Sequence, residues 1–200
     1  MKIVLATHNR GKMEELTQLL YNLPIKILTL NEYPEIGDIP ETGSTLRENA
    51  FIKAKTVHQI TGLPALADDT GLEVDALNGE PGVYSARYAG GNATFKDNCN
   101  KILTELSGIP MSKRTARFRT IIAFVTKDQN VWTEGKVEGV ILNHMEGDGG
   151  FGYDSIFYYP PLEKTFASLE KEEKNNVSHR GKAIRNFSVI LKNWIKNNNS

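Results

Sequence analysis

The chain has 200 residues and carries 24 basic and 24 acidic side chains, so its formal net charge is zero. A chain of this length can bury a sizeable core, and we expect a single domain over residues 1–200. The even balance of charge disfavours a protein that binds nucleic acid or an anionic membrane through a general positive field. The lone Cys99 leaves no pair for an internal disulfide, and no apolar run approaches the length of a membrane span. We therefore expect a cytoplasmic protein.

The N-terminal residues predict a strand, a helix and a second strand. Ile3–Ala6 is a continuous apolar run, which is the pattern of a strand buried on both faces. The helix that follows places its apolar side chains between Met13 and Leu20 at helical spacing. The second strand is expected at 25–30.

The next elements place a pair of acidic residues at the end of a third strand. Thr45 and Glu48 form a capping-box pattern that opens a helix ending near Thr61. A short apolar strand at Leu63–Ala67 then leads into a tight acidic turn, Ala67–Gly71.

The second half of the chain predicts a long β-hairpin and a final helix. The elements expected in order are a short strand at 71–76, a turn at 78–82, a helix at 97–106, strands at 115–126 and 131–140, a glycine-rich loop at 147–152 and a helix from near Gly181. A polar turn joins the two long strands. Because strands and helices alternate early while a hairpin dominates later, we expect an α/β fold with a mixed twisted sheet flanked by helices.

A polar run at residues 7–12, Thr-His-Asn-Arg-Gly-Lys, joins the first strand to the first helix. Such a turn directs backbone N–H groups and the positive end of the helix toward one point, which suits phosphate. Thr7 and Asn9 can add hydrogen bonds, and Lys12 adds a charge. The run lacks the spaced glycines of a Walker A loop, so a plain connector with a solvated Lys12 is the alternative.

Three carboxylates, Glu41, Asp68 and Asp69, are candidate ligands of Mg²⁺, a hard cation that bridges to substrate phosphates. Adjacent side chains on a strand point to opposite sides, so one member of the Asp68–Asp69 pair can face a metal while the other faces water. Lys53 is a candidate phosphate ligand. The alternatives are a polar turn for the acidic pair, a helix-dipole contact or solvation for Glu41, and a snorkelling side chain for Lys53.

Two further motifs offer groups that recognise a purine base. The loop 149–154 combines glycines with Phe151, which can stack on a base, and Asp154, which can accept a hydrogen bond from a base N–H. Lys174 and the run Ser178–Arg180 supply donors for purine carbonyl oxygens. The alternatives are a loop seated on the core by its aromatic side chains and an N-cap formed by Ser178.

Together these motifs resemble the inosine triphosphate/xanthosine triphosphate pyrophosphatase family. The matches span nearly the whole chain in the family's order. The chain departs from the family at Ser155, where Pro usually stands. The matching runs are Ala6–Lys12, Glu41–Gly43, Glu48–Ala50, Ala67–Leu77, Pro81–Gly90, Phe151–Asp154 and Ser178–Arg180.

The resemblance implies an inosine triphosphatase-like fold, a homodimer, and hydrolysis of ITP, dITP or XTP to the monophosphate and pyrophosphate by water attack at the α-phosphorus. It implies Mg²⁺ held by Glu41, Asp69 and the adjacent Asp68, with Asp69 as the general base. No nucleic acid or membrane partner is expected. The substrate-binding residues that it implies are Thr7, His8, Asn9, Arg10, Gly11, Lys12, Lys53, Thr70, Phe151, Gly152, Tyr153, Asp154, Lys174, His179 and Arg180.

The implied base site also suggests a basis for selectivity. Donors from His179 and Arg180 would pair with a 6-oxo group and would be left unpaired by adenine, at a cost of about 1–3 kcal/mol each. Guanine shares the 6-oxo group, so its rejection must depend on its 2-amino group.

Three alternatives stand beside this interpretation. A Maf-like pyrophosphatase has a similar architecture but usually carries an N-terminal Ser-x-Ser-Pro-Arg-Arg run, which residues 7–12 do not match. A non-catalytic nucleotide sensor would keep the pocket, although the intact Glu41, Lys53 and Asp69 argue against lost catalysis. A nucleic-acid-binding module is disfavoured because the net charge is zero and no basic face is clustered.

Overall fold

The computed structural model describes residues 1–198. The chain divides into two compact units, each assembled from separate stretches of sequence. Unit 1 contains residues 1–69, 120–135 and those from Arg180 onward, and unit 2 contains residues 70–119 and 136–179. The single domain expected over residues 1–200 stays a prediction.

Seven strands form one mixed sheet, in the order β2-β1-β3-β4-β5-β6-β7. β1 pairs in parallel with β2 and β3, whereas β6 pairs antiparallel with β5 and β7. This confirms the mixed α/β fold, and the long hairpin is present as β4 and β5. The strands are β1 Lys2–Leu5, β2 Lys26–Thr29, β3 Ala65–Val74, β4 Thr115–Val125, β5 Asn130–Ile141, β6 Phe157–Tyr159 and β7 Lys164–Thr165. The helices are α1 Arg10–Leu20, α2 Leu46–Thr61, α3 Phe95–Glu105, α4 Lys171–Val177 and α5 His179–Asn198.

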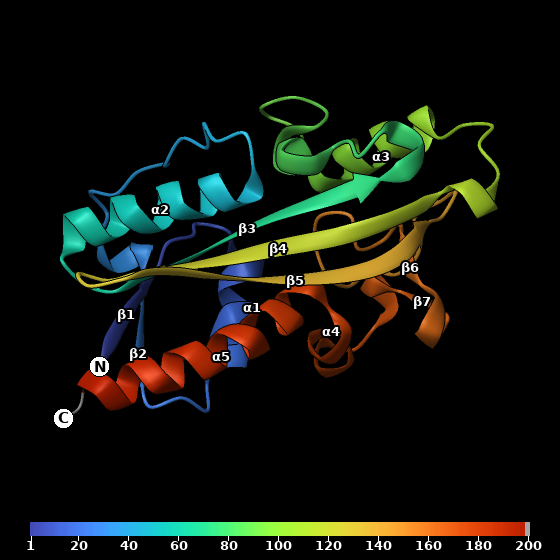
Figure 1. Cartoon of the computed structure of the whole chain (residues 1–200). Coiled ribbons are helices and arrows are strands. Elements are labelled where there is room, and N and C mark those ends of the chain that lie inside the picture. Colours follow the sequence, from blue (N-terminus) through green and yellow to red (C-terminus); the bar gives the residue numbers. More distant parts are fainter. Residues whose placement is uncertain (199–200) are drawn as a thin grey trace. The chain divides into compact units, whose positions relative to one another are not determined.

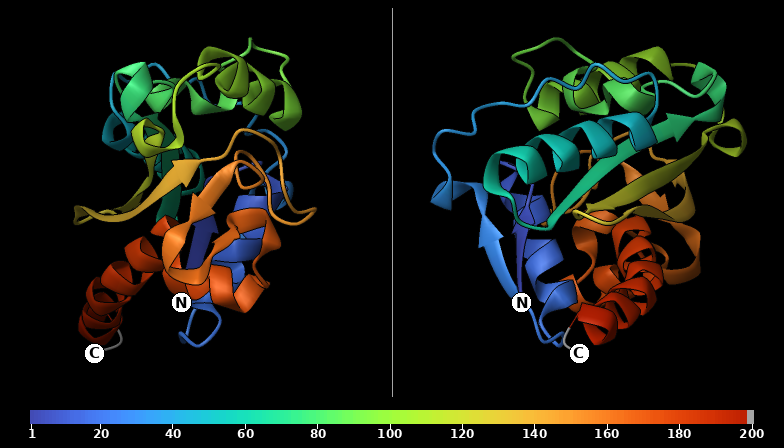
Figure 2. Two further views of the ribbon diagram at one scale, coloured as in Figure 1. Left: turned by 90° about the vertical axis from the view of Figure 1, so that its right-hand side faces the viewer. Right: turned by 60° about the vertical axis from the view of Figure 1, so that its left-hand side comes forward.

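In unit 1, helices cover both faces of the sheet. Figure 1 shows α2 on one face and α1 with α5 on the other, and the turned views of Figure 2 agree. The core between the sheet and the helices α1 and α5 is fully apolar and includes Leu5, Leu16, Phe124 and Phe187. The side chains of α5 that enter this core, among them Ile184, Leu191 and Ile195, recur at helical spacing.

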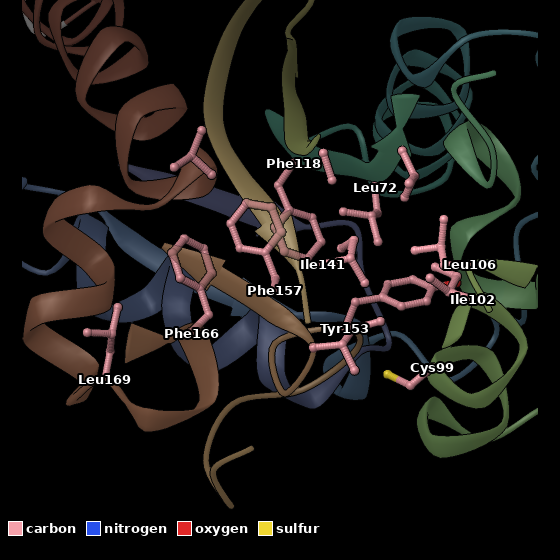
Figure 3. Close-up of a cluster of buried hydrophobic side chains, with 14 residues drawn as sticks. Leu72, Cys99, Ile102, Leu106, Phe118, Ile141, Tyr153, Phe157, Phe166 and Leu169 are labelled. Carbon is pink, nitrogen blue, oxygen red and sulfur yellow. The ribbon is translucent and has the colours of Figure 1, made fainter. Parts of the chain in front are cut away.

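Unit 2 has its own apolar core, which Figure 3 shows in close-up. Phe118, Phe157 and Phe166 pack against one another with ring centroids 4.6 to 6.0 Å apart. Ile102 and Leu106 bring α3 onto the same cluster. This core supports the glycine-rich loop, because Tyr153 belongs to it and is almost fully buried.

The tight turn expected at Ala67–Gly71 is wrong, because β3 runs without interruption from Ala65 to Val74. Because β3 continues through the acidic pair, the side chains of Asp68 and Asp69 still point to opposite sides of the strand. Turn propensity is a local preference, and here it is overridden by the place of β3 in the sheet between β1 and β4 and by cations that face both carboxylates. The result is a straight, rigid support for Asp68 and Asp69.

Candidate active site

The polar run at residues 7–12 forms the N-terminus of α1. Asn9 is the N-cap, and its side-chain oxygen accepts a hydrogen bond from the backbone N–H of Lys12 at 3.0 Å. The backbone N–H of Asn9 donates to the hydroxyl of Thr7 at 3.2 Å. Thr7 and Asn9 therefore hold the shape of the strand-to-helix turn, and this capping fixes where the side chain of Lys12 begins.

Three other residues of this run, His8, Arg10 and Gly11, are not partners in the ion pair between Lys12 and Asp68. Arg10 has a side chain that is 87% exposed, and it pairs with Glu14 one turn along the helix at 2.9 Å. The ring nitrogen Nε2 of His8 lies 3.2 Å from the carbonyl oxygen of Gly37. Gly11 occupies the first turn of α1. Their contribution to substrate binding stays a prediction.

Asp68 is a fully buried carboxylate that contacts two cations. Its Oδ2 lies 3.2 Å from Nζ of Lys12 and 3.0 Å from Nη2 of Arg180. Burial by itself raises the pKa of Asp68, but the charges of Lys12 and Arg180 prevail and hold it below its ordinary value. Burial also lowers the pKa of Lys12, against the opposing effect of Asp68. Asp68 is thus kept ionised.

Asp69 faces a different cation, Lys53, which also holds Glu41. The Lys53 ammonium donates to Asp69 Oδ1 at 2.8 Å and to Glu41 Oε1 at 2.7 Å. Burial alone lowers the pKa of Lys53, but the two carboxylates raise it above its ordinary value. Burial is also the main reason why the pKa of Asp69 is raised, since Lys53 and Lys12 act in the opposite direction. The two carboxylates of the Asp68–Asp69 pair therefore differ in their electrostatic surroundings.

Glu41 and Asp69 converge on one position, which the Lys53 ammonium fills. Two carboxylate oxygens around a positive charge fit Mg²⁺, which is usually bound by one or two carboxylates together with phosphates and water. Within residues 1–198, no group of three or more His, Cys, Asp or Glu side chains is arranged to hold a metal ion.

Arg180 was expected at the base, and the structure places it against Asp68. Its side chain is 1% exposed, and it also pairs with Glu15 of α1. In this arrangement the guanidinium of Arg180 orients Asp68, and the role of Arg180 in recognising the purine base stays a prediction. Sequence reasoning missed Glu15, although its position three residues after Lys12 in α1 places the two side chains on neighbouring parts of the helix surface.

The loop that carries Glu41 is tied to α2 by another residue that sequence reasoning left without a role. The side-chain oxygen of Asn49 accepts a hydrogen bond from the backbone N–H of Gly43 at 2.7 Å, and Asn49 is fully buried. A Cβ on Gly43 would lie 2.6 Å from Cβ of Glu48, so no larger residue fits this close approach. The available signal was the run Glu48–Ala50 among the family matches.

In unit 2, Asp154 organises the loop that carries Phe151. Its Oδ2 accepts from the backbone N–H of Phe151 at 2.8 Å and from Nζ of Lys174 at 2.7 Å. Both Asp154 and Lys174 are buried. Gly150 has φ +70°, and a Cβ there would collide with the Asp154 carboxylate, so glycine is required. The Lys174 ammonium also lies 4.8 Å from the centre of the Phe151 ring.

The remaining predicted base-site residues of unit 2 lie largely beneath this loop. Tyr153 donates its hydroxyl hydrogen to the carbonyl of Ser85 at 2.8 Å. The carbonyl of Gly152 accepts from the thiol of Cys99 at 3.4 Å. His179 is 3% exposed and stacks on Phe118 with centroids 4.6 Å apart. The contacts of Tyr153 and Gly152 hold the loop from the core side, and His179 packs against the aromatic core of the same unit.

The predicted site residues thus fall into two groups. The first, in unit 1, is a buried set of cations and carboxylates: Lys12, Glu41, Lys53, Asp68, Asp69 and Arg180. The second, in unit 2, is the Phe151–Asp154 loop with Lys174 and His179. Thr70 follows Asp69 in β3 and is half-buried. The first group suits phosphate and metal, and the second suits a flat ring with polar edges.

Comparison with known proteins gives similarities that extend over nearly the whole chain. A model described as the Ham1 family matches residues 3–190. The dITP/XTP pyrophosphatase of Desulforamulus reducens is 48% identical over 192 residues, which are 96% of this chain and 96% of that relative. The dITP/XTP pyrophosphatase of Geobacter sulfurreducens is 48% identical over 184 residues, 92% of each chain.

Solved structures show the same similarity in three dimensions. A HAM1 protein from Coxiella burnetii has a TM-score of 0.88 and 44% identity, and it covers 96% of this chain and 99% of its own. The Ham1 protein of Staphylococcus aureus has a TM-score of 0.86 and 39% identity, with the same coverage.

Among residues 1–198, none of the helices combines the length and the hydropathy that a membrane-spanning helix requires.

Proposed function

Because this chain belongs to the Ham1 family, we propose that it hydrolyses non-canonical purine nucleoside triphosphates, namely ITP, dITP and XTP, to the monophosphate and pyrophosphate. The single observation that best supports this is the Lys53 ammonium held between Glu41 and Asp69. Lys53 is a cationic partner for phosphate, and the carboxylates of Glu41 and Asp69 are oxygen ligands of the kind that Mg²⁺ takes. The names of the similar proteins, dITP/XTP pyrophosphatase, supply the substrate class.

The triphosphate is assigned to the lysines of unit 1. Phosphoryl transfer requires that negative charge be neutralised and that a water molecule be positioned in line with the leaving group. Lys12 and Lys53 carry the charge, and the capped N-terminus of α1 adds backbone N–H groups. Glu41 and Asp69 are the residues that would hold Mg²⁺, with Asp68 adjacent. Mg²⁺ bound there would neutralise phosphate charge and make water more acidic.

Asp69 is assigned the role of general base. Its raised pKa makes it a better proton acceptor than an ordinary aspartate. The water oxygen forms a bond to the α-phosphorus as Asp69 takes its proton. The bond from the α-phosphorus to the bridging oxygen breaks, and pyrophosphate leaves. Asp68, kept ionised between Lys12 and Arg180, holds Lys12 in place.

The base is assigned to the loop of unit 2. Phe151 supplies a stacking surface, and Asp154 fixes both Phe151 and Lys174. Lys174 lies over one face of the Phe151 ring, so His179 and Arg180 are the candidate donors to the edge of a base stacked on the other face. Donors suit the 6-oxo group of hypoxanthine or xanthine, and the amino group of adenine cannot satisfy them.

The test is pyrophosphate release from a panel of canonical and non-canonical triphosphates, with Mg²⁺ and with a chelator. We expect turnover of ITP, dITP and XTP that exceeds turnover of ATP and GTP, and loss of turnover with the chelator. Asp69→Asn is the matched variant, and it should bind ITP without hydrolysing it, because the amide cannot accept the proton.

Three outcomes would contradict the proposal. Binding of ITP without hydrolysis by the unaltered chain would favour a nucleotide sensor. Preference for other nucleotides would favour a Maf-like activity. Near-normal turnover by Asp69→Asn would remove Asp69 from the mechanism.

We also propose a cytoplasmic homodimer. The support is the resemblance to the family and, for the cytoplasm, the single buried Cys99, which fits a reducing compartment. Sedimentation of the purified chain tests the dimer, and a mass of one chain, about 22.3 kDa, would contradict it.

A further inference from the structure

Phe95 is an exposed aromatic residue beside the loop that carries Phe151. It is the first residue of α3, and it is 49% exposed. Its ring centroid lies 6.2 Å from that of Phe151, with an angle of 43° between the ring planes. This distance is within the range of interacting aromatic pairs, but the rings are neither parallel nor perpendicular.

Phe151 cannot offer both of its faces to a base. The Lys174 ammonium lies over the ring, 4.8 Å from its centre. Lys174 is held there by its 2.7 Å ion pair with Asp154, and both residues are buried. A base that stacks on Phe151 therefore takes the face that Lys174 leaves open, and Phe95 is an exposed aromatic ring whose centroid lies 6.2 Å from that of Phe151.

The backbone of Phe95 is fixed, whereas its ring has room to turn. Thr94 is the N-cap of α3, and its hydroxyl accepts from the backbone N–H of Asp97 at 3.2 Å. The Asp97 carboxylate accepts in return from the backbone N–H of Thr94 at 2.8 Å. This capping box sets the position of the Phe95 Cα. Because the side chain is half exposed, rotation about its χ1 angle meets little packing.

We propose that Phe95 forms the second aromatic wall of the base site, so that the purine is bound between Phe95 and Phe151. This inference rests on the proposed function, in which Phe151 stacks on the base. A small rotation of Phe95 would bring its ring toward parallel with that of Phe151. Since every base has a π-face, Phe95 contributes affinity for nucleotides and does not discriminate among purines.

The test compares ligands with and without a base. In Phe95→Ala, we expect the KM for ITP and the Kd for IMP, measured by calorimetry, to rise about tenfold, the scale of one lost base–aromatic stack. The kcat should stay within about twofold, because no reacting atom is touched. The inhibition constant of inorganic tripolyphosphate, which has no base, should not change. Phe95→Trp should restore the affinity.

Two controls separate stacking from folding. Tyr21→Ala removes an aromatic side chain that is 82% exposed on unit 1 and should leave the IMP Kd unchanged. Phe95→Leu keeps apolar bulk without a ring, so it should also weaken IMP binding. If Phe95→Ala lowers the midpoint of thermal unfolding, the IMP Kd of Phe95→Leu is compared with that of Phe95→Trp instead.

Unchanged IMP affinity in Phe95→Ala or Phe95→Leu would overturn the inference, and so would equal weakening of IMP and tripolyphosphate. Because IMP binding needs no turnover, its result is distinct from a failure to release pyrophosphate, which would instead overturn the proposed function.

Discussion

The Asp68 carboxylate has no exposed surface and contacts two cations, so its charge has a predictable effect on stability. Asp68→Asn keeps the shape of the side chain but leaves Lys12 and Arg180 without its counter-charge. Removing one partner from a buried ion pair costs about 3–5 kcal/mol. We expect the free energy of unfolding, measured with urea near neutral pH, to fall by about that amount. Asp97→Asn, at an exposed helix cap, should cost less. Because the folded protein lowers the pKa of Asp68, the stability of the fold depends on pH. The stabilisation by the ionised carboxylate is complete above the ordinary Asp pKa of about 3.9. It is lost as the pH falls toward the pKa of Asp68 in the folded protein. On acidification the unaltered chain should therefore lose more stability than Asp68→Asn, and parallel profiles would contradict this account. Residue types and motifs were enough to predict Glu41, Lys53 and Asp69 as one group, and the structure brings them together. The partners of Arg180 could not be predicted, because they lie 112 and 165 residues away in sequence and no local pattern encodes such contacts.

The elements that carry the site depend on a few backbone anchors, and the hydrogen bond from Gly43 to Asn49 is the clearest of them. Asn49→Ala leaves the partly buried N–H of Gly43 without its partner and should cost about 1–3 kcal/mol of stability. It should also lower kcat for ITP, because the loop that presents Glu41 to Lys53 is no longer held to α2. Thr45→Ala is the matched variant: it removes the N-cap of the same helix, should cost about 1 kcal/mol, and should leave kcat unchanged. Equal kcat in the two variants would show that Asn49 acts on stability alone. The start of α2 could be predicted from Thr45 and Glu48 because a capping box is a local sequence pattern. The course of β3 through Asp68 and Asp69 could not be predicted, because it depends on the place of β3 between β1 and β4, two strands that are distant in sequence. The short elements α4, β6 and β7 were not predicted either, since two to seven residues show no measurable periodicity.

For the whole molecule, the division of candidate residues between the two units predicts that affinity for phosphate and affinity for the base can be altered separately. Lys12 belongs to unit 1 and Asp154 to unit 2, and their ion-pair partners, Asp68 and Lys174, lie in the same respective units. Lys12→Met removes a phosphate partner, so it should weaken inhibition by inorganic tripolyphosphate and raise the KM for ITP together. Asp154→Asn releases Lys174 and the N–H of Phe151, so it should raise the KM for ITP by about tenfold and leave tripolyphosphate inhibition unchanged. The measurement is the ratio of the two constants in each variant, with the unaltered chain as reference. Because effects at independent sites add, the double variant should show the sum of the two changes in binding free energy, within about 0.5 kcal/mol. A larger deviation, or equal weakening of both ligands by Asp154→Asn, would mean that the loop of unit 2 also supports the phosphate site.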